Sequence, residues 1–258
     1  MKYLFALLIS FSILYSCGNK KENVQNTKVL HDENPAADGF NAEGSDQKAI
    51  DIADQVMQAM GGRKNWDDER FFKWNFFGAR TLWWDKLKGD VRIQMHKSDS
   101  TVILVNIYDG SGKVFLNGSE TSHPDSLSKY LKRGKGIWIN DAYWLFMPFK
   151  LKDSGVTLNY ICEDTTQTGI AAHRLQLIFE NVGNTPQNKY NVWVDKSDSL
   201  VKQWAFFREY NMEEPNFINP WAGYEKYGSL LLSGDRGKRK ISDIEVRDQM
   251  DASIFIEL

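Results

Sequence analysis

The pattern of apolar and polar positions divides this 258-residue chain into three parts. Residues 3–15 are largely apolar, residues 18–45 carry only scattered apolar positions, and residues 46–258 show regular periods. The first run is shorter than the roughly 20 residues that cross a bilayer, so it is typical of an export signal. The second part cannot bury enough apolar surface to offset the entropy of ordering it. We therefore predict one folded domain over residues 46–258, preceded by a signal and a flexible tether.

The domain is predicted to begin with an amphipathic helix over residues 47–60. Asp46 stands at the N-cap position, and Gly61-Gly62 supplies the left-handed conformation in which many helices end. One such helix cannot bury its apolar side alone, so we expect it to pack on a larger element. The apolar residues recur every three or four positions, at Ile50, Ala53, Val56 or Met57, and Met60.

Alternating positions then predict one strand after another. Residues 101–108 are apolar on both faces, which indicates a strand that is covered on both sides. Asn117-Gly118 is the strongest short signal for a hairpin turn. In residues 71–78 the large side chains on one face are Phe72, Trp74 and Phe76. The predicted strands lie in residues 71–78, 90–96, 101–108, 113–117, 155–164, 171–180, 189–196, 199–207, 220–237, 240–248 and 253–258.

Residues 124–147 interrupt this alternation. Pro124 suits the first turn of a helix, and Leu127, Tyr130 and Leu131 follow at helical spacing. Residues 137–151 are the most aromatic segment of the chain. With roughly ten strands at hairpin-like spacing and two or three helices, the pattern predicts a mainly β (α+β) fold. The meandering antiparallel sheet is either a barrel or a strongly curved half-barrel.

A cysteine marks the point where the first apolar run ends. Leu14-Tyr15-Ser16-Cys17 resembles the bacterial lipobox, in which the signal is cut before a cysteine that receives a diacylglycerol. The resemblance implies a lipoprotein signal peptide over residues 1–16, followed by lipidated Cys17 and a tether over residues 17–45. Gly18, in place of Asp, implies the outer membrane by resemblance to lipoprotein sorting rules. It leaves the side of that membrane open. The alternative is an ordinary signal peptide with a stray cysteine.

Composition narrows the class of partner. The formal net charge is −2 and no basic stripe stands out, so we expect no nucleic-acid partner. Aromatic residues are frequent, with 9 Trp, 10 Tyr and 15 Phe, which suits a packed core, a ligand cavity or a membrane edge. If Cys17 is lipidated, Cys162 has no partner for an intrachain disulfide. Its strand-like surroundings favour a small buried side chain.

Three stretches of the domain resemble the LolA/LolB-like lipoprotein-carrier superfamily. They are the helix, Gly-Gly stop and aromatic strand of residues 49–78, the turn in YNVWVDKSDSLVKQW at residues 190–204, and YWLFMPFKL at residues 143–151. The last resembles a helix-to-strand passage in uncharacterised Bacteroidetes lipoproteins. The resemblance implies a curved antiparallel half-barrel of about ten strands, lidded by two or three helices. It also implies an apolar cavity that holds a lipid or a lipoprotein acyl chain.

Such a cavity needs no reactive group and no cofactor, because affinity comes from apolar area removed from water. The alternative is that all these side chains are filled core, the usual fate of aromatic residues. The candidate lining residues lie on strand faces and on the lid, at Trp74, Phe76, Trp138, Trp144, Met147 and Phe149.

The sequence favours a protein that is not an enzyme. It has no H-E-x-x-H, C-x-x-C or G-x-S-x-G motif, which leaves a metal site without support. A hydrolase with a dispersed Ser-His-Asp set stays open, because a triad is defined by geometry. The other alternative is an envelope interaction or structural lipoprotein without a ligand. In that case Trp221, Tyr224 and Tyr227 form an exposed surface for an envelope protein partner, or they cap the sheet.

Overall fold

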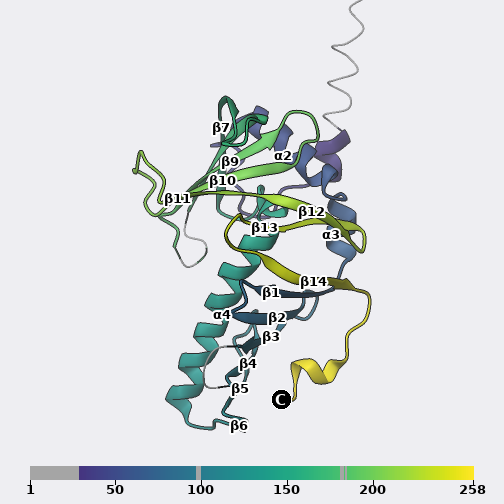
Figure 1. Cartoon of the computed structure of the whole chain (residues 1–258), viewed down its shortest axis with the longest axis vertical. Helices are drawn as coiled ribbons and strands as arrows, with labels where there is room; N and C mark the ends of the chain where they lie inside the picture. Colours follow the sequence, from purple (N-terminus) through teal and green to yellow (C-terminus); the bar gives the residue numbers. More distant parts are fainter. Residues whose placement is uncertain (1–28, 97–99, 181–182, 184) are drawn as a thin grey trace, which may run out of the picture.

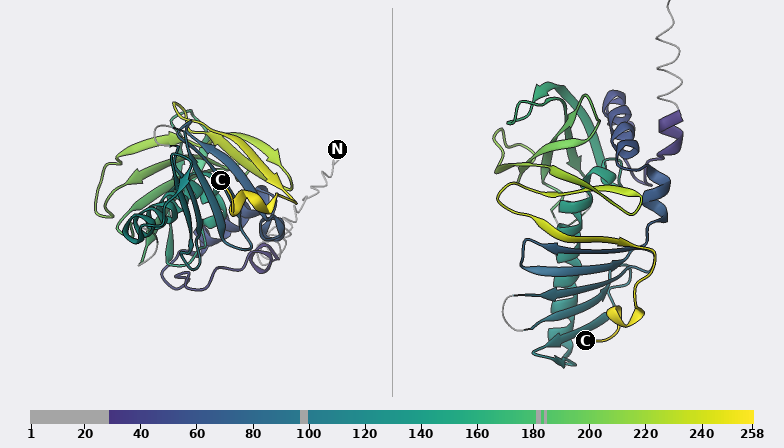
Figure 2. Two further views of the ribbon diagram at one scale, coloured as in Figure 1. Left: turned by 90° about the horizontal axis from the view of Figure 1, so that it is seen from below. Right: turned by 45° about the vertical axis from the view of Figure 1, so that its right-hand side comes forward.

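One long helix, α4 (Pro124–Phe146), runs beside the sheets, which arch around it (Figures 1 and 2). The computed structural model describes residues 29–96, 100–180, 183 and 185–258. α4 packs on strands of the first sheet, and aromatic rings of its C-terminal half contact rings of both sheets. The helix therefore connects the two β layers.

The first sheet has seven antiparallel strands. β1 pairs with β2, the next strand along the chain, and with β14, which is more than 160 residues away. In spatial order the strands are β14 (Ile241–Arg247), β1 (Phe71–Phe76), β2 (Arg80–Asp85), β3 (Asp90–Met95), β4 (Val102–Asn106), β5 (Gly112–Leu116) and β6 (Ser119–Glu120).

The second sheet has five antiparallel strands. In spatial order they are β11 (Phe217–Pro220), β10 (Val201–Phe207), β9 (Lys189–Asp195), β8 (Ala171–Phe179) and β7 (Val156–Thr165). A separate hairpin of β12 (Ala222–Tyr227) and β13 (Leu230–Asp235) contacts β14 of the first sheet.

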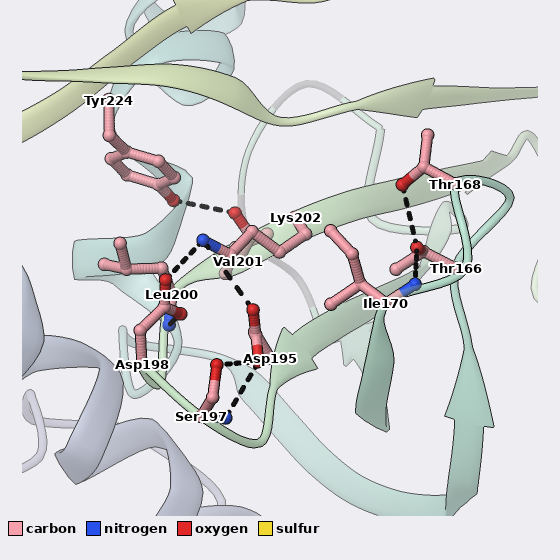
Figure 3. Close-up of polar contacts among 10 residues, drawn as sticks. All are labelled: Thr166, Thr168, Ile170, Asp195, Ser197, Asp198, Leu200, Val201, Lys202 and Tyr224. Atoms are coloured by element: carbon pink, nitrogen blue, oxygen red, sulfur yellow. Dashed lines mark hydrogen bonds and ion pairs between the residues drawn. The ribbon is translucent and has the colours of Figure 1, made fainter.

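Figure 3 shows how this hairpin is attached to the second sheet. The Tyr224 hydroxyl donates to the Val201 carbonyl at 2.9 Å. Just before β10, the Asp195 carboxylate accepts from the backbone N–H and hydroxyl of Ser197, and Lys202 lies 3.8 Å from Asp195. This is the turn of residues 190–204 that carries part of the resemblance. Its polar residues stabilise the turn and the start of β10.

The predicted fold class is confirmed. The described residues form an open, mainly antiparallel β structure with helices against it, and the sheets do not close into a barrel. These residues contain fourteen strands where about ten were expected. β2 was missed because Trp83 and Trp84 are adjacent and break the alternation. The two-residue β6 and the short β11 were missed as well, and residues 220–237 contain two strands and not one.

Two predicted segments are wrong in type. Residues 143–151 do not lead into a strand, because α4 continues to Phe146 and is followed by a 3₁₀ helix, η1 (Met147–Lys150). Residues 253–258 are not a strand either, since η2 (Ala252–Phe255) is a 3₁₀ turn. There Arg92 on β3 donates to the Ile254 carbonyl at 3.2 Å and to the Glu257 carbonyl at 2.7 Å. The C-terminal segment therefore lies against β3 without extending a sheet.

The first helix, α2 (Gln47–Ala59), follows the prediction, and Ile50, Ala53, Val56 and Met57 are buried. Gly61 and Gly62 have φ of +117° and +86°, as the helix stop requires. A Cβ at Gly61 would lie 2.6 Å from the Ser229 carbonyl oxygen. Asp46 occupies the N-cap position as predicted, but its side chain makes no cap hydrogen bond and instead accepts from the Tyr160 N–H at 2.8 Å. α3 (Arg63–Asp68) then leads into β1.

The folded part extends N-terminally beyond residue 46. Asn34 is buried and donates to the Asp54 carboxylate of α2 at 2.7 Å. Lys152 is also buried, pairs with Asp54 and donates to the Asn34 carbonyl. Phe40 packs against the main core. Residues 34–45, assigned above to the tether, thus contact the domain.

The core lies between α4 and the concave face of the sheets. Trp74, Ile103 and Trp204, from β1, β4 and β10, belong to one buried cluster. β4 is buried on both faces, as its sequence predicts, and Val102 and Leu104 form a second cluster on the opposite face with Phe115. Apolar packing along α4 therefore positions the site described next.

Candidate functional site

Two cavities adjoin the C-terminal half of α4. Cavity A has a volume of about 430 Å³ and cavity B of about 360 Å³. Both volumes lie within the range of roughly 300–1,000 Å³ that is common for ligand pockets. The residues that line both cavities are Ile139, Tyr143, Phe179 and Gly183. The two spaces are therefore neighbours that share a wall.

Aromatic rings form most of the wall of cavity A. Tyr190 on β9 stacks on Trp204 on β10, with ring centroids 5.3 Å apart and planes 2° apart. Trp144 on α4 meets Trp204 edge-on at 4.7 Å and stacks on Phe217 at 5.7 Å. Trp204 and Phe206 lie on the same face of β10, because side chains alternate along a strand. The wall thus follows from the two-residue period of β9 and β10.

Cavity B lies between α3, β2 and α4. Trp66 of α3 stacks on Phe149 at 4.6 Å, and Trp84 of β2 meets Trp138 of α4 edge-on at 5.2 Å. Its polar lining residues are Lys150, Asp153 and Ser154, and Lys150 pairs with Asp153. The cavity therefore has an apolar wall with a small polar part.

Tyr143 is the aromatic residue of α4 that lines both cavities. Its ring centroid lies 5.2 Å from that of Tyr190 and 6.2 Å from that of Phe179. Its hydroxyl is buried and has no hydrogen-bond partner among the described residues. Burial raises the pKa of Tyr143 well above its usual value, because a phenolate there would lose its hydration. The side chain is therefore neutral and keeps its proton for donation.

Tyr190 lies in a similar setting but has a polar neighbour. Burial raises the pKa of Tyr190 to about 12, although a hydrogen bond with Asn188 acts in the opposite direction. Both tyrosines are thus uncharged at neutral pH. Cavity A gains no charge from them.

The structure separates the six predicted lining residues into two groups. Trp138 lines cavity B and Trp144 lines cavity A. The other four are buried in the core and line neither cavity: Trp74, Phe76, Met147 and Phe149. These four side chains are therefore part of the packed core, which was the alternative to lining a ligand cavity.

Several lining residues were not predicted. Tyr143 stands next to Trp144 in the aromatic segment, so its type and place could have suggested it. Trp204 and Phe206 alternate along a predicted strand, and this pattern was a usable signal. Trp66 and Trp84 gave none, because α3 is a single short helix and β2 was not recognised.

Among the described lining residues of the two cavities, the titratable side chains are those of Tyr143, Tyr190, Lys150 and Asp153. Their described lining residues include no histidine and no cysteine. Among the parts of the chain that the structure describes, no group of His, Cys, Asp and Glu could hold a metal ion. The same parts contain no helix that is long and apolar enough to span a membrane.

The predicted aromatic partner surface is not present. Trp221 is buried, and Tyr224 and Tyr227 are only partly exposed. Trp221 packs edge-on against Trp204 at 5.5 Å, so it belongs to the core beneath the hairpin. Capping of the sheet, the second of the two alternatives, describes these rings.

Only one of the two cysteines lies among the residues that the structure describes. Cys17 lies outside the described residues, and its lipidation stays a prediction. Cys162 lies on β7, as its strand-like surroundings predicted, but it is half-buried and not fully buried.

Comparisons with known proteins give matches by structure only. No protein-family model matches the chain, and no curated protein does. A DUF1329 family protein from Desulfovibrio piger is 11% identical, with 80% of this chain and 96% of that chain covered and a TM-score of 0.43. A domain assigned to outer membrane lipoprotein sorting, from Vibrio parahaemolyticus, is 10% identical, with 81% and 96% covered and a TM-score of 0.40.

A LolA superfamily protein from Nitrosomonas europaea is 10% identical, with 80% of this chain and 96% of that chain covered and a TM-score of 0.43. At these identities and TM-scores the likeness is loose. A member of the superfamily named by the sequence resemblance is nonetheless among the solved structures to which this chain is similar.

Proposed function

We propose that this chain is an outer-membrane lipoprotein that binds an acyl chain of a lipid or lipoprotein in cavities A and B. The observation that carries the proposal is the pair of adjoining, aromatic-lined cavities beside α4. Burying apolar ligand area there gains about 25 cal/mol per Å², which needs no reactive side chain. The predicted lipid at Cys17 would keep the domain near its ligands.

Mass spectrometry of non-covalently bound lipids tests the binding. The full chain is purified from membranes and extracted with solvent, which leaves a covalent lipid on the protein. We expect a stoichiometric lipid or acyl species from the wild type. Ile139→Trp should lose most of this lipid. Ile139 lines both cavities, so a larger ring at this position would occupy part of the space in each.

The matched control for this experiment is Ile161→Trp, which places the same ring at an exposed position on β7. It should keep the lipid. Circular dichroism of both variants shows that each is folded. A wild-type chain that carries no lipid would overturn the proposal and favour an envelope interaction protein without a ligand.

The anchor is tested separately. Cells that express the chain are fed a labelled fatty acid, and we expect label on the wild-type protein but not on Cys17→Ala. Cys162→Ala is the matched control, since Cys162 lies within the folded domain on β7. Equal labelling of Cys17→Ala and the wild type would exclude Cys17 as the lipidation site.

A further inference from the structure

The N-terminal half of α4 carries an excess of positive charge. Residues 124–136 contain four basic residues and one acidic residue, although the whole chain has a formal net charge of −2. Residues 137–146, the C-terminal half, contain no basic residue. The four basic side chains are exposed, and none forms an ion pair among the described residues: Lys129, Lys132, Arg133 and Lys135.

This placement does not stabilise the helix itself. Lys129 lies three residues before Lys132 and four before Arg133, so like charges are neighbours on the helix surface. Such pairs destabilise a helix. Cations interact favourably with a helix C-terminus, whereas these lie in the other half of α4. Their compensation therefore comes from outside the helix, from solvent or from a partner.

Two of these lysines line a groove between α4 and the turn that follows β4. The groove has a volume of about 530 Å³ and combines apolar side chains with the two cations. The carboxylate next to it in sequence is engaged elsewhere, because Asp109 accepts from the Ser111 N–H at 2.8 Å. The residues that line this α4 groove are Gly110, Pro124, Leu127, Ser128, Leu131, Lys132 and Lys135.

The groove lies at one end of the molecule. Figure 1 shows the N-terminal half of α4 at one end of the long axis, beside β4, β5 and β6. The first described segment, drawn in purple, lies toward the other end. The basic end is therefore remote from the side on which the described chain begins.

An anionic bilayer surface matches this combination of side chains. Its charged headgroups extend over a wide area, so several lysines can each find a counter-charge without a fixed geometry. Apolar side chains among the cations can enter the boundary between headgroups and acyl chains, as in helices that lie on membranes. An acidic protein would instead have to place carboxylates opposite several separate, flexible side chains.

We propose that the N-terminal half of α4 docks on an anionic phospholipid bilayer, with Lys129, Lys132, Arg133 and Lys135 against the headgroups. Leu127 and Leu131 meet the boundary below them. No described residue of the α4 groove lines cavity A or B, so this inference is independent of acyl binding there. It gives the domain a membrane contact that needs no lipid on Cys17.

Vesicle flotation tests the docking. The full chain is reconstituted in nanodiscs of neutral phosphatidylcholine, which accommodate any lipid on its N-terminus, and is then mixed with vesicles. We expect it to float with vesicles that contain phosphatidylglycerol but not with vesicles of phosphatidylcholine alone. Raising the salt from about 0.1 to about 0.5 M should release it, because exposed charges are then screened.

Lys132→Gln/Lys135→Gln should weaken binding to the charged vesicles about 25-fold, since each lysine near an anionic surface contributes about fivefold. The matched control is Lys226→Gln/Lys238→Gln. It removes the same charge from two exposed lysines that lie outside the α4 groove and form no ion pair among the described residues. It should bind nearly as the wild type does, and circular dichroism shows that both variants are folded.

Each outcome decides the proposal. A wild type that does not float with charged vesicles overturns it, and binding of polyglutamate in that case assigns the surface to an acidic protein. Equal weakening by both double variants overturns it too, because overall charge would then be responsible. Ile139→Trp, which is designed to block cavities A and B, should float like the wild type, so failure of acyl binding and failure of docking are told apart.

Discussion

One buried carboxylate holds the N-terminal segment against the domain. Asp54 accepts from Asn34 at 2.7 Å and lies 3.2 Å from the His31 ring nitrogen, and it pairs with buried Lys152. Asp54→Ala would leave the Lys152 ammonium buried without a counter-charge. We expect it to lower the free energy of unfolding by about 3–5 kcal/mol, measured by urea titration.

The same variant should expose the segment around Asn34 to proteases. The double variant Asp54→Ala/Lys152→Met should recover part of the stability, because it removes the unpaired charge as well. If Asp54→Ala were as stable and as protease-resistant as the wild type, the contact would not hold the segment.

Asp85 makes stability depend on pH. Burial raises the pKa of Asp85, but two hydrogen bonds from Arg70, at 2.9 and 2.7 Å, and the backbone N–H groups of Leu87 and Lys88 outweigh it. The net pKa of Asp85 is lowered in the folded state. The stabilisation is therefore fully present above the unfolded-state pKa of about 4 and is lost as the pH falls through the lower folded-state value.

Asp85→Asn should accordingly cost about 1.5–3 kcal/mol near neutral pH, as for hydrogen bonds to a charged group. The difference from the wild type should shrink as the pH is lowered from about 5 to about 2. Urea unfolding of both proteins across this range measures it. A difference that does not change with pH would show that the charge of Asp85 is not responsible.

At the scale of single residues, the sequence predicted that the lining of the site is aromatic. It did not predict most of the individual residues that line the two cavities. The aromatic segment of residues 137–151 does supply both cavities, through Trp138 and Trp144. Which rings face a cavity depends on how α4 is rotated against β9 and β10. No periodicity within one segment contains that information, because it arises from packing between distant elements.

At the scale of elements, α4 approaches β4 closely at one glycine. A Cβ at Gly134 would lie 2.8 Å from Ile103 Cγ2 and 3.3 Å from Val105 Cγ1. Gly134→Ala gains about 1 kcal/mol in helix propensity but adds a methyl group to a filled interface, which costs about 1–3 kcal/mol. We expect a net loss of up to about 2 kcal/mol in thermal or urea unfolding.

Ser128→Ala is the control for that experiment, since Ser128 is exposed on the same helix. It should change stability by less than about 0.5 kcal/mol. A Gly134→Ala protein that is more stable than the wild type would mean that α4 can move away from β4 at no cost.

The elements that could be predicted are those with a clean period. α2 and most strands followed their apolar positions, whereas α4 was only partly recognised. α4 contains Gly134 and Gly136, which disfavour a helix, and its C-terminal half is aromatic on several sides because it is enclosed by sheets. The short 3₁₀ helices η1 and η2 carry no periodic signal at all.

At the scale of the whole molecule, α4 belongs to both β layers. It packs on β4 and β5 of the first sheet, and its rings contact Tyr190 and Trp204 of the second. Neither sheet can lose α4 without exposing its own core. We therefore expect one unfolding transition, with coincident urea midpoints for far-ultraviolet circular dichroism and tryptophan fluorescence. Two separate midpoints would show that the layers unfold independently.

The pairing of β1 with both β2 and β14 has a consequence for biogenesis. β14 begins at Ile241, so one edge of β1 has no partner until residues 241–247 have been synthesised. An open strand edge rich in aromatic side chains readily pairs with other chains. Contacts between residues so far apart also form slowly. The interval before β14 closes this edge is therefore the period in which the chain most depends on chaperones.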